Sequence, residues 1–275
     1  MKLEGACVVV TGGSRGIGKA MAAAFAERGS SVVIAARSKD EVESAVAELG
    51  AGGRRLLGVP TDVTDPEQVQ HLATLAEREF GPVSVLVNNA GSLTAVGPTW
   101  ELDQEQWSAD VQTNLWGTFL CCRAIMPGMV ARGHGYVINL VGGGATGPHV
   151  YGSGYGCSKA GVLAFTETLA LEAAETGVKV FALSPGLVKT RMTTALAEGA
   201  EGRRWRPFIG QMLKDGRDVP PEEAAELALK LVSGRADRLV GCLFSVRDDF
   251  DAIVRAADAV LQNEGLRLRL KPWST

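Results

Sequence analysis

The chain has 275 residues, of which 46% are hydrophobic and 21% are charged, and its formal net charge at pH 7 is −3. These values are typical of a globular protein with a substantial core and exclude the composition of a disordered chain. A slightly acidic chain gives no reason to expect affinity for nucleic acid or for an anionic membrane surface.

The sequence contains no apolar run of the roughly 18 residues needed to span a bilayer, and its first residues show no secretory signal. We therefore expect no membrane association. The five cysteines show neither paired nor metal-ligand spacing, and they are Cys7, Cys121, Cys122, Cys157 and Cys242. Reduced thiols in the core of a cytoplasmic protein are expected, and no metal site is predicted.

Short apolar runs alternate with amphipathic segments along most of the chain. The runs expected to form strands are residues 6–10, 31–36, 54–60, 83–88, 136–141, 178–183 and 243–246. The segments expected to form helices between them are residues 19–28, 39–49, 66–80, 104–132 and 153–176. Repeated strand–helix units of this kind build a Rossmann-like, doubly wound parallel sheet with helices on both faces. The pattern predicts an α/β fold of about seven strands in a single domain over residues 1–275.

Two segments depart from this alternation. Residues 192–218 contain glycine, arginine and aromatic residues and are poorly periodic. Residues 249–275 form a C-terminal extension, in which a helix is expected at 250–263 and is followed by alternating Leu and Arg at 266–270. That alternation suggests an extended arm on the chain's own surface or on a neighbour's.

A glycine-rich turn joins the first expected strand to the first expected helix. It contains Gly12, Gly16 and Gly18. Glycines at these positions permit a tight turn and let the backbone approach a pyrophosphate, which the N-terminus of the following helix stabilises. The turn therefore predicts a dinucleotide site.

A second feature, Tyr155 and Lys159, lies within the helix expected at 153–176. Residues four apart on a helix project from the same face. A cation beside a phenol favours its ionisation, so we expect the pKa of Tyr155 to lie below the usual value of about 10. A phenol tuned in this way is suited to general acid or base catalysis.

Four motifs in this order resemble the classical type of the short-chain dehydrogenase/reductase family. They are Thr11-Gly12-xxx-Gly16-Ile17-Gly18, Asn88-Asn89-Ala90-Gly91, Tyr155-xxx-Lys159 and Ser184-Pro185-Gly186. The resemblance covers about residues 4–248. It implies a small-molecule substrate, an NAD(P) cofactor and a homodimer or homotetramer assembled through the two long helices.

The resemblance also implies roles for individual residues. Tyr155 matches the proton donor or acceptor, and Lys159 matches the residue that holds the nicotinamide ribose and lowers the Tyr155 pKa. Asn114 matches a helix residue that anchors a water in the proton relay; without the resemblance it would be a polar helix residue with a local backbone bond. The positions that match cofactor-binding residues are Gly12, Ser14, Arg15, Gly16, Ile17, Gly18, Asp62, Val63, Asn88, Ala90, Gly91, Tyr155, Lys159, Pro185, Gly186, Val188 and Thr190.

The end of the second expected strand bears on the choice of cofactor. An acidic residue there would bind the ribose 2′-hydroxyl of NAD and repel a 2′-phosphate. The sequence instead reads Ala36-Arg37-Ser38. Arg37, together with Arg15, can form charge-assisted bonds to a phosphate, which favours NADP(H) over NAD(H). The alternative is that Arg37 is only a solvated loop charge.

One position departs from the family pattern. The family places a serine near the end of the fifth strand to bind the substrate carbonyl, and the corresponding residue is Gly142. Loss of such a donor can cost about 100- to 1,000-fold in rate. The candidates to replace it are Thr146, Ser153, a backbone N–H of the glycine run or a water. For Ser153 the favoured role is the N-cap of the long helix, and His149 and Tyr151 are expected in the loop or pocket wall.

Residues 192–218 occupy the place of the family's substrate lid. Trp205 and Phe208 would cover an apolar ligand there, with arginines reaching an anionic group; the alternative is a solvated loop. Three functions remain open. The first is an NADPH-dependent oxidoreductase that interconverts a ketone and a secondary alcohol, with Tyr155 as general acid or base. The others are a cofactor-binding regulatory protein with little redox activity and a redox-neutral dehydratase or isomerase using Tyr155 as base.

Overall fold

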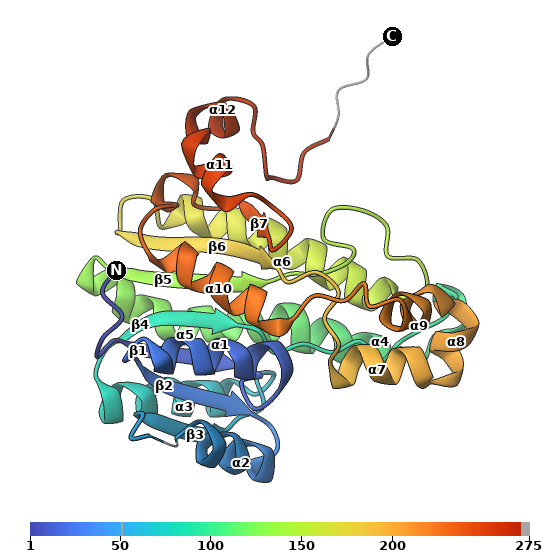
Figure 1. Ribbon diagram of the computed structural model, residues 1–275, viewed down its shortest axis with the longest axis horizontal. Coiled ribbons are helices and arrows are strands. Elements are labelled where there is room, and N and C mark those ends of the chain that lie inside the picture. Colours follow the sequence, from blue (N-terminus) through green and yellow to red (C-terminus); the bar gives the residue numbers. More distant parts are fainter. Residues whose placement is uncertain (51, 271–275) are drawn as a thin grey trace.

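The computed structural model describes residues 1–50 and 52–270. Its centre is a sheet of seven parallel strands in the order β3-β2-β1-β4-β5-β6-β7 (Figure 1). The strands are β1 Cys7–Thr11, β2 Ser31–Ala36, β3 Leu56–Pro60, β4 Val83–Asn88, β5 Gly135–Leu140, β6 Val178–Ser184 and β7 Leu243–Ser245. The predicted α/β fold and its doubly wound sheet are confirmed.

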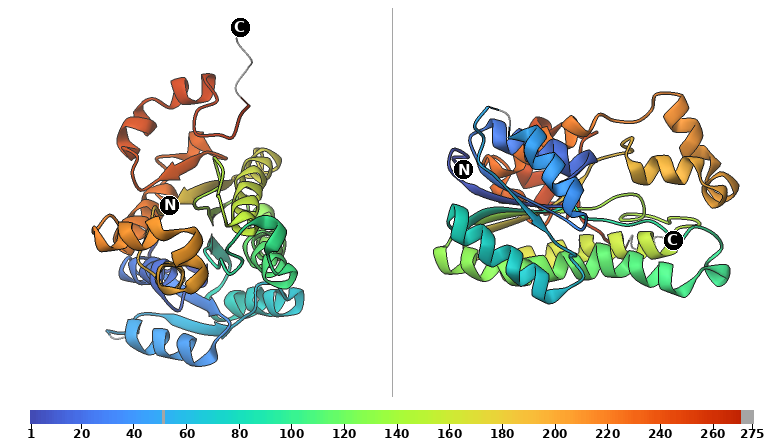
Figure 2. Two further views of the ribbon diagram at one scale, coloured as in Figure 1. Left: turned by 90° about the vertical axis from the view of Figure 1, so that its right-hand side faces the viewer. Right: turned by 90° about the horizontal axis from the view of Figure 1, so that it is seen from below.

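The strands are apolar because helices cover both faces of the sheet, so side chains that point to either side are buried. All five residues of β1 are buried, for example. The right-hand view of Figure 2 shows the two helical layers on opposite sides of the sheet. One layer contains α1 Gly16–Glu27, α2 Lys39–Leu49 and α10 Pro221–Val232, and the other contains α3 Pro66–Phe80, α5 Gly117–Arg132 and α6 Ser153–Glu172.

Helix α10 is not among the helices expected from the sequence, yet seven of its residues are buried against the sheet and α1. Pro220 is its N-cap and Pro221 its first residue. Proline at the first helical position is compatible with a helix because the N–H it lacks would have no partner within the helix.

The helix expected at residues 104–132 is divided into three parts. It runs as α4 Gln104–Val111, a π-helical turn η2 Gln112–Trp116, and α5. A π-turn contains one residue more than an α-turn and often occurs at functional sites. In this turn Asn114 is fully buried and reaches other parts of the chain. Those long-range bonds account for an interruption that hydrophobic periodicity does not reveal.

Residues 192–218 form three short helices rather than an irregular loop. They are α7 Arg191–Glu198, α8 Ala200–Trp205 and α9 Pro207–Lys214, and they lie beyond the carboxyl ends of the strands (Figure 1). Each helix has at most eight residues, too few for a periodic pattern to emerge. We call residues 191–214 the three-helix segment.

The C-terminal extension folds back onto its own chain. The helix expected at 250–263 is divided at Ala256 into α11 Phe250–Arg255 and α12 Ala257–Gln262. The arm that follows is held by Leu266, whose carbonyl accepts from the Leu243 N–H at 2.8 Å, and by an ion pair between Arg269 and Glu167 of α6. Residues 271–275 of the predicted extension lie outside the described residues.

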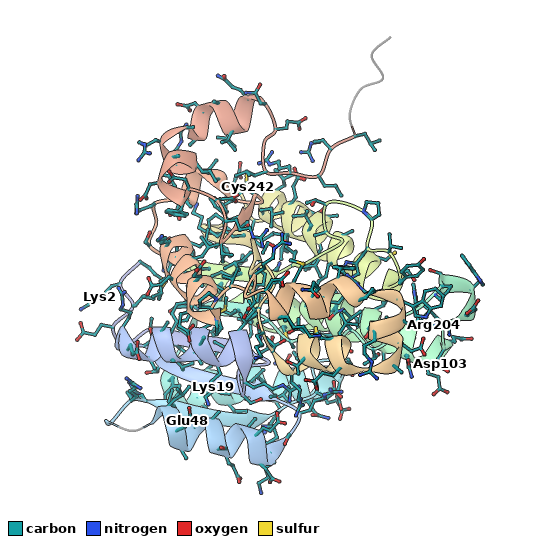
Figure 3. The ribbon with its side chains drawn as sticks, turned by 45° about the vertical axis from the view of Figure 1, so that its right-hand side comes forward. Lys2, Lys19, Glu48, Asp103, Arg204 and Cys242 are labelled. Atoms are coloured by element: carbon teal, nitrogen blue, oxygen red, sulfur yellow. The ribbon has the colours of Figure 1, made fainter. Side chains whose placement is uncertain are left out.

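An ion pair on the surface links two helices of one layer. Figure 3 shows its partners, Lys19 of α1 and Glu48 of α2, side by side.

Four of the five cysteines are buried, as predicted, whereas Cys157 is exposed. Cys157 lies about 200° around α6 from Tyr155, so when Tyr155 faces the sheet Cys157 faces outward.

Among the described residues, no helix combines the length and apolarity needed to cross a bilayer. Within the same ranges no group of three His, Cys, Asp or Glu side chains is arranged to hold a metal ion.

Candidate active site

A cavity of about 720 Å³ opens at the carboxyl ends of the central strands. Its wall extends from the β1–α1 turn across the ends of β2, β4 and β5 to the start of α7. Doubly wound folds bind ligands in the crevice at this edge of the sheet. The predicted cofactor-binding residues that line the cavity are Gly12, Ser14, Arg15, Gly16, Ile17, Arg37, Asp62, Val63, Ala90, Gly91, Tyr155, Lys159, Pro185 and Thr190.

Four predicted cofactor residues do not line this cavity: Gly18, Asn88, Gly186 and Val188. Gly18 packs α1 against the turn, because a Cβ there would lie 2.3 Å from the Gly12 carbonyl oxygen. Asn88 steadies the sheet, since its Nδ2 donates to Asn139 Oδ1 on β5 at 2.9 Å. Gly18 and Asn88 therefore support the residues that line the cavity without lining it themselves.

The glycine turn fits a pyrophosphate. Gly12 has a φ of +63°, a left-handed conformation that favours glycine. Its carbonyl accepts from Asn89 Nδ2 at 3.1 Å, which holds the turn against the end of β4. Arg15, the N-cap of α1, makes no side-chain capping bond. The first N–H groups of α1 therefore keep their capacity to bind a phosphate.

Tyr155 and Lys159 project from one face of α6 into the cavity, as their spacing predicts. Lys159 is buried and its Nζ donates to the Leu140 carbonyl at the end of β5, at 2.9 Å. The same Nζ lies 5.7 Å from the centre of the Tyr155 ring. The phenol, the ammonium group and the glycine turn thus share one cavity.

Asn114 ties α6 to the loop after β4. Its Nδ2 donates to the Ser92 carbonyl and to Ser158 Oγ, both at 2.9 Å, and its Oδ1 accepts from the Ser92 N–H at 2.8 Å. The expectation of a local backbone bond is therefore wrong for this side chain. Because its amide is fully engaged, Asn114 positions the neighbours of Tyr155 and Lys159.

The pKa values of Tyr155 and Lys159 are both shifted from their usual values. Desolvation raises the pKa of Tyr155 to about 12. The positive charge of Arg206 lowers this pKa, and the negative charge of Asp110 raises it by a smaller amount. Burial lowers the pKa of Lys159 to about 8. The prediction that the Tyr155 pKa is lowered is therefore wrong here, because desolvation outweighs the nearby cation. The cation that acts on the phenol is Arg206.

Gly142 lies directly against the phenol. A Cβ at this position would be 2.3 Å from Tyr155 Oη and 3.2 Å from its Cζ. The Tyr155 hydroxyl thus fills the space beside the backbone where a larger residue would place its side chain. Any side chain at position 142 requires Tyr155 to move.

The hydroxyl candidates for the serine role do not lie at the phenol. Ser153 Oγ accepts from Trp107 Nε1 at 3.1 Å and from Thr99 Oγ1 at 3.0 Å, and Thr146 is exposed. The predicted N-cap role of Ser153 is wrong as well. Gly152 is the N-cap of α6, and Ser153 is the first helical residue, held by a tertiary bond to Trp107.

His149 and Arg206 are the side chains that instead approach Tyr155. The His149 ring centre is 5.2 Å from the Tyr155 ring centre, and its Nε2 contacts Nη1 of Arg206. Burial and the Arg206 charge lower the pKa of His149 to about 4. Because arginine can only donate, Nε2 of the neutral imidazole accepts and Nδ1 carries the proton. The sequence assigns these residues to a loop and a lid, and no local pattern reveals their contact.

Comparison with known proteins agrees with this geometry. A family model described as short chain dehydrogenase matches residues 6–201. The chain is 35% identical to the 3-oxoacyl-(acyl-carrier-protein) reductase of Vibrio cholerae over 88% of its own length and 95% of the relative's. It is 36% identical to the cis-4-hydroxycyclohexanecarboxylate dehydrogenase of Sinomonas cyclohexanicum, over 89% and 96% of the two chains.

The chain belongs to the short-chain dehydrogenase family. Among solved structures, a variant of actinorhodin polyketide ketoreductase with NADPH superposes with a TM-score of 0.78 and 32% identity, over 87% of this chain and 94% of that one. The protein is therefore an oxidoreductase of the short-chain dehydrogenase type, similar to ketoreductases.

The cavity of this short-chain dehydrogenase contains a charged corner, formed by Glu41, Arg15, Arg37 and Arg191. Glu41 of α2 binds Arg15 at 2.7 Å and Arg191 of α7 at 2.8 Å. Arg37 is exposed at the end of β2 and makes no ion pair within the described ranges. The predicted pair of phosphate-binding arginines is thus unequal, because Glu41 already balances Arg15 while Arg37 is uncompensated.

Proposed function

We propose that this short-chain dehydrogenase is an NADPH-dependent oxidoreductase that interconverts a ketone and a secondary alcohol. The observation that supports this most directly is that Tyr155 and Lys159 line the same cavity as the glycine turn. A nicotinamide cofactor supplies the hydride, and no residue of the cavity needs to take part in electron transfer. The cofactor-binding residues we propose are those predicted above, and 14 of them line the cavity.

The chain's own groups handle the proton and hold the reactants. Tyr155 Oη donates a proton to the carbonyl oxygen in reduction and accepts one in oxidation. Lys159 holds the ribose of the cofactor, and Asn114 holds the Ser92 loop and Ser158 around Tyr155 and Lys159. The three residues remain our proposed catalytic and positioning set.

The preference for NADPH rests on Arg37. Its guanidinium lines the cavity without an ion-pair partner within the described residues, so it is free to bind a 2′-phosphate. The solved relative that contains NADPH supports the same choice. Glu41 at this corner would repel a phosphate, but Arg15 and Arg191 neutralise it.

We further propose one domain with a substrate lid at residues 192–218, working in the cytoplasm as a homodimer or homotetramer. Exposed aromatic residues at the start of α5, Trp116 and Phe119, support the assembly, together with the partly buried Phe165 of α6. Trp116 stacks on Phe119, with ring centres 5.1 Å apart, and Phe119 meets Phe165 at 6.3 Å. Such a patch is typical of an interface. Light scattering that finds only monomers would contradict this proposal.

The proposed function is tested by NADPH consumption, followed at 340 nm with a panel of ketones. We expect turnover by the wild type and a loss of about 100- to 10,000-fold in kcat for Tyr155→Phe, with NADPH still bound. NADPH binding without turnover of any ketone would favour the cofactor-binding regulatory protein. Conversion of a hydroxy compound without a change in NADPH would favour the dehydratase or isomerase.

A further inference from the structure

Arg206 is a buried cation without an anionic partner. It lies between α8 and α9, and only 5% of its surface is exposed. Its Nε is buried and has no hydrogen-bond partner. No carboxylate within the described residues lies within ion-pair distance of it, whereas Arg15, Arg191 and Arg269 all bind glutamates.

A buried guanidinium is costly unless it is paired and hydrogen-bonded. Arg206 contacts His149 through Nη1 and lies over the Phe208 ring at 5.3 Å, and neither the neutral imidazole nor the ring is an anion that balances its charge. Burial also lowers the pKa of Arg206, which reflects the same unfavourable environment. An anion bound to Arg206 would therefore be stabilised by the guanidinium charge and by its free N–H groups.

The unsatisfied part of Arg206 has a defined geometry. His149 takes up Nη1, so Nε and Nη2 are left together on one edge of the planar group. This edge presents two parallel N–H donors, which match the two oxygens of a carboxylate. A lysine at this position could not offer the same fork.

Arg206 and His149 lie next to the phenol, just outside the residues that line the cavity. His149 packs against the Tyr155 ring and lies beside the glycine run, where a Cβ on Gly143 would be 2.9 Å from its Cε1. Trp205, the neighbour of Arg206, packs on Tyr151 with ring centres 4.9 Å apart. The three-helix segment is thus docked on the 149–151 loop next to the phenol.

We propose that Arg206, positioned by His149, binds a carboxylate of the substrate, so that the enzyme acts on keto acids and the corresponding hydroxy acids. This inference rests on the proposed function and names its substrate class. It assigns to the three-helix segment a polar recognition role in addition to an apolar cover. Neutral ketones and neutral acyl thioesters are then poor substrates.

The first test compares matched acids and esters. The probes are 4-oxopentanoate and 4-oxocyclohexanecarboxylate, each measured with NADPH beside its methyl ester. We expect the wild type to prefer each acid over its ester by about 10- to 100-fold in kcat/KM, the range of a charge-assisted hydrogen-bonded pair. Arg206→Met should abolish the preference, because the rate with the acid falls much further than the rate with the ester.

Arg204→Met is the matched control. Arg204 lies two residues away on the outside of α8, where Figure 3 shows it at the edge of the molecule, and its guanidinium covers the Trp205 ring at 4.5 Å. This variant should keep the wild-type preference. Equal losses with acid and ester in Arg206→Met would overturn the proposal, because they would place Arg206 on the carbonyl oxygen in the role of the missing serine. A wild type that does not prefer acids would overturn it too.

A second test separates this inference from the proposed function by measuring binding without turnover. With NADP⁺ present, 4-oxopentanoate should raise the thermal unfolding temperature of the wild type and of Arg204→Met but not of Arg206→Met. If no ketone is turned over and this shift is still seen, the proposed redox activity fails and the carboxylate site stands. If ketones are turned over and 4-oxopentanoate gives no shift, the carboxylate site fails alone.

The unfolding temperature of Arg206→Met shows whether this variant still folds. Removal of an unpaired buried charge should leave the unfolding temperature of Arg206→Met at or above that of the wild type. If the variant unfolds early, Arg206→Lys replaces it. This variant keeps the charge and loses the fork, so the acid preference should fall at least threefold; an unchanged preference would contradict bidentate recognition.

Discussion

The contact between Gly142 and Tyr155 permits a quantitative prediction for Gly142→Ala. The added Cβ would lie 2.3 Å from Tyr155 Oη, whereas a carbon and an oxygen that are not bonded approach to roughly 3.2–3.4 Å. The hydroxyl must therefore move by about 1 Å. A displacement of that size at a reacting group costs on the order of 100-fold, and overpacking costs about 1–3 kcal/mol of stability.

We expect Gly142→Ala to lower kcat/KM for ketone reduction by about 100-fold, with a free energy of unfolding reduced by about 1–3 kcal/mol. The assay is NADPH oxidation at saturating cofactor, and urea unfolding reports stability. Gly147→Ala is the control, since a Cβ there meets nothing within 4 Å and the residue belongs to the same loop. It should behave as the wild type.

Gly142→Ser separates the steric effect from the chemical one. The family resemblance alone predicts that a restored serine raises the rate, whereas the structure predicts that its Cβ displaces the phenol as alanine does. We therefore expect Gly142→Ser to remain below the wild type. Full activity in Gly142→Ala would refute the reasoning, because it would show that Tyr155 moves aside without loss.

Two further predictions concern the cofactor and pH. Arg37→Ala should raise the KM for NADPH by about 10- to 100-fold and leave the KM for NADH unchanged, and equal effects on both would remove the argument for a 2′-phosphate site. The pKa of His149 is about 4 in the folded chain and about 6.5 when unfolded, so the unfolded state binds more protons between these values. The free energy of unfolding should therefore rise from pH 4 to pH 6.5, and this rise should shrink in His149→Asn; urea titrations that give the same slope for both proteins would contradict it.

The sheet and the cofactor half of the site could be predicted because they depend on local sequence. A buried parallel strand is an apolar run, and the glycine turn between β1 and α1 is marked by its own spacing. Tyr155 and Lys159 are one helical turn apart, so their shared face follows from position alone. These features do not depend on distant parts of the chain.

The substrate half could not be predicted because it depends on contacts between segments far apart in sequence. Arg206 and His149 are 57 residues apart, and Glu41 and Arg191 are 150 residues apart. The N-cap prediction for Ser153 is wrong for the same reason, since a bond to Trp107 competes with capping. The predicted direction of the Tyr155 pKa shift is wrong because the desolvation that raises this pKa comes from packing, which the spacing of Lys159 does not report.

Together, Gly142 and Arg206 connect substrate binding to the acidity of Tyr155. Arg206 is the cation that lowers the Tyr155 pKa, yet desolvation still raises that pKa to about 12. When a carboxylate binds Arg206, its charge is balanced and its lowering effect on the phenol weakens. Because that pKa is already about 12, the phenol holds the proton that reduction requires with or without a bound acid, and binding of a carboxylate would raise the pKa further. A glycine at 142 leaves room for the hydroxyl at this position.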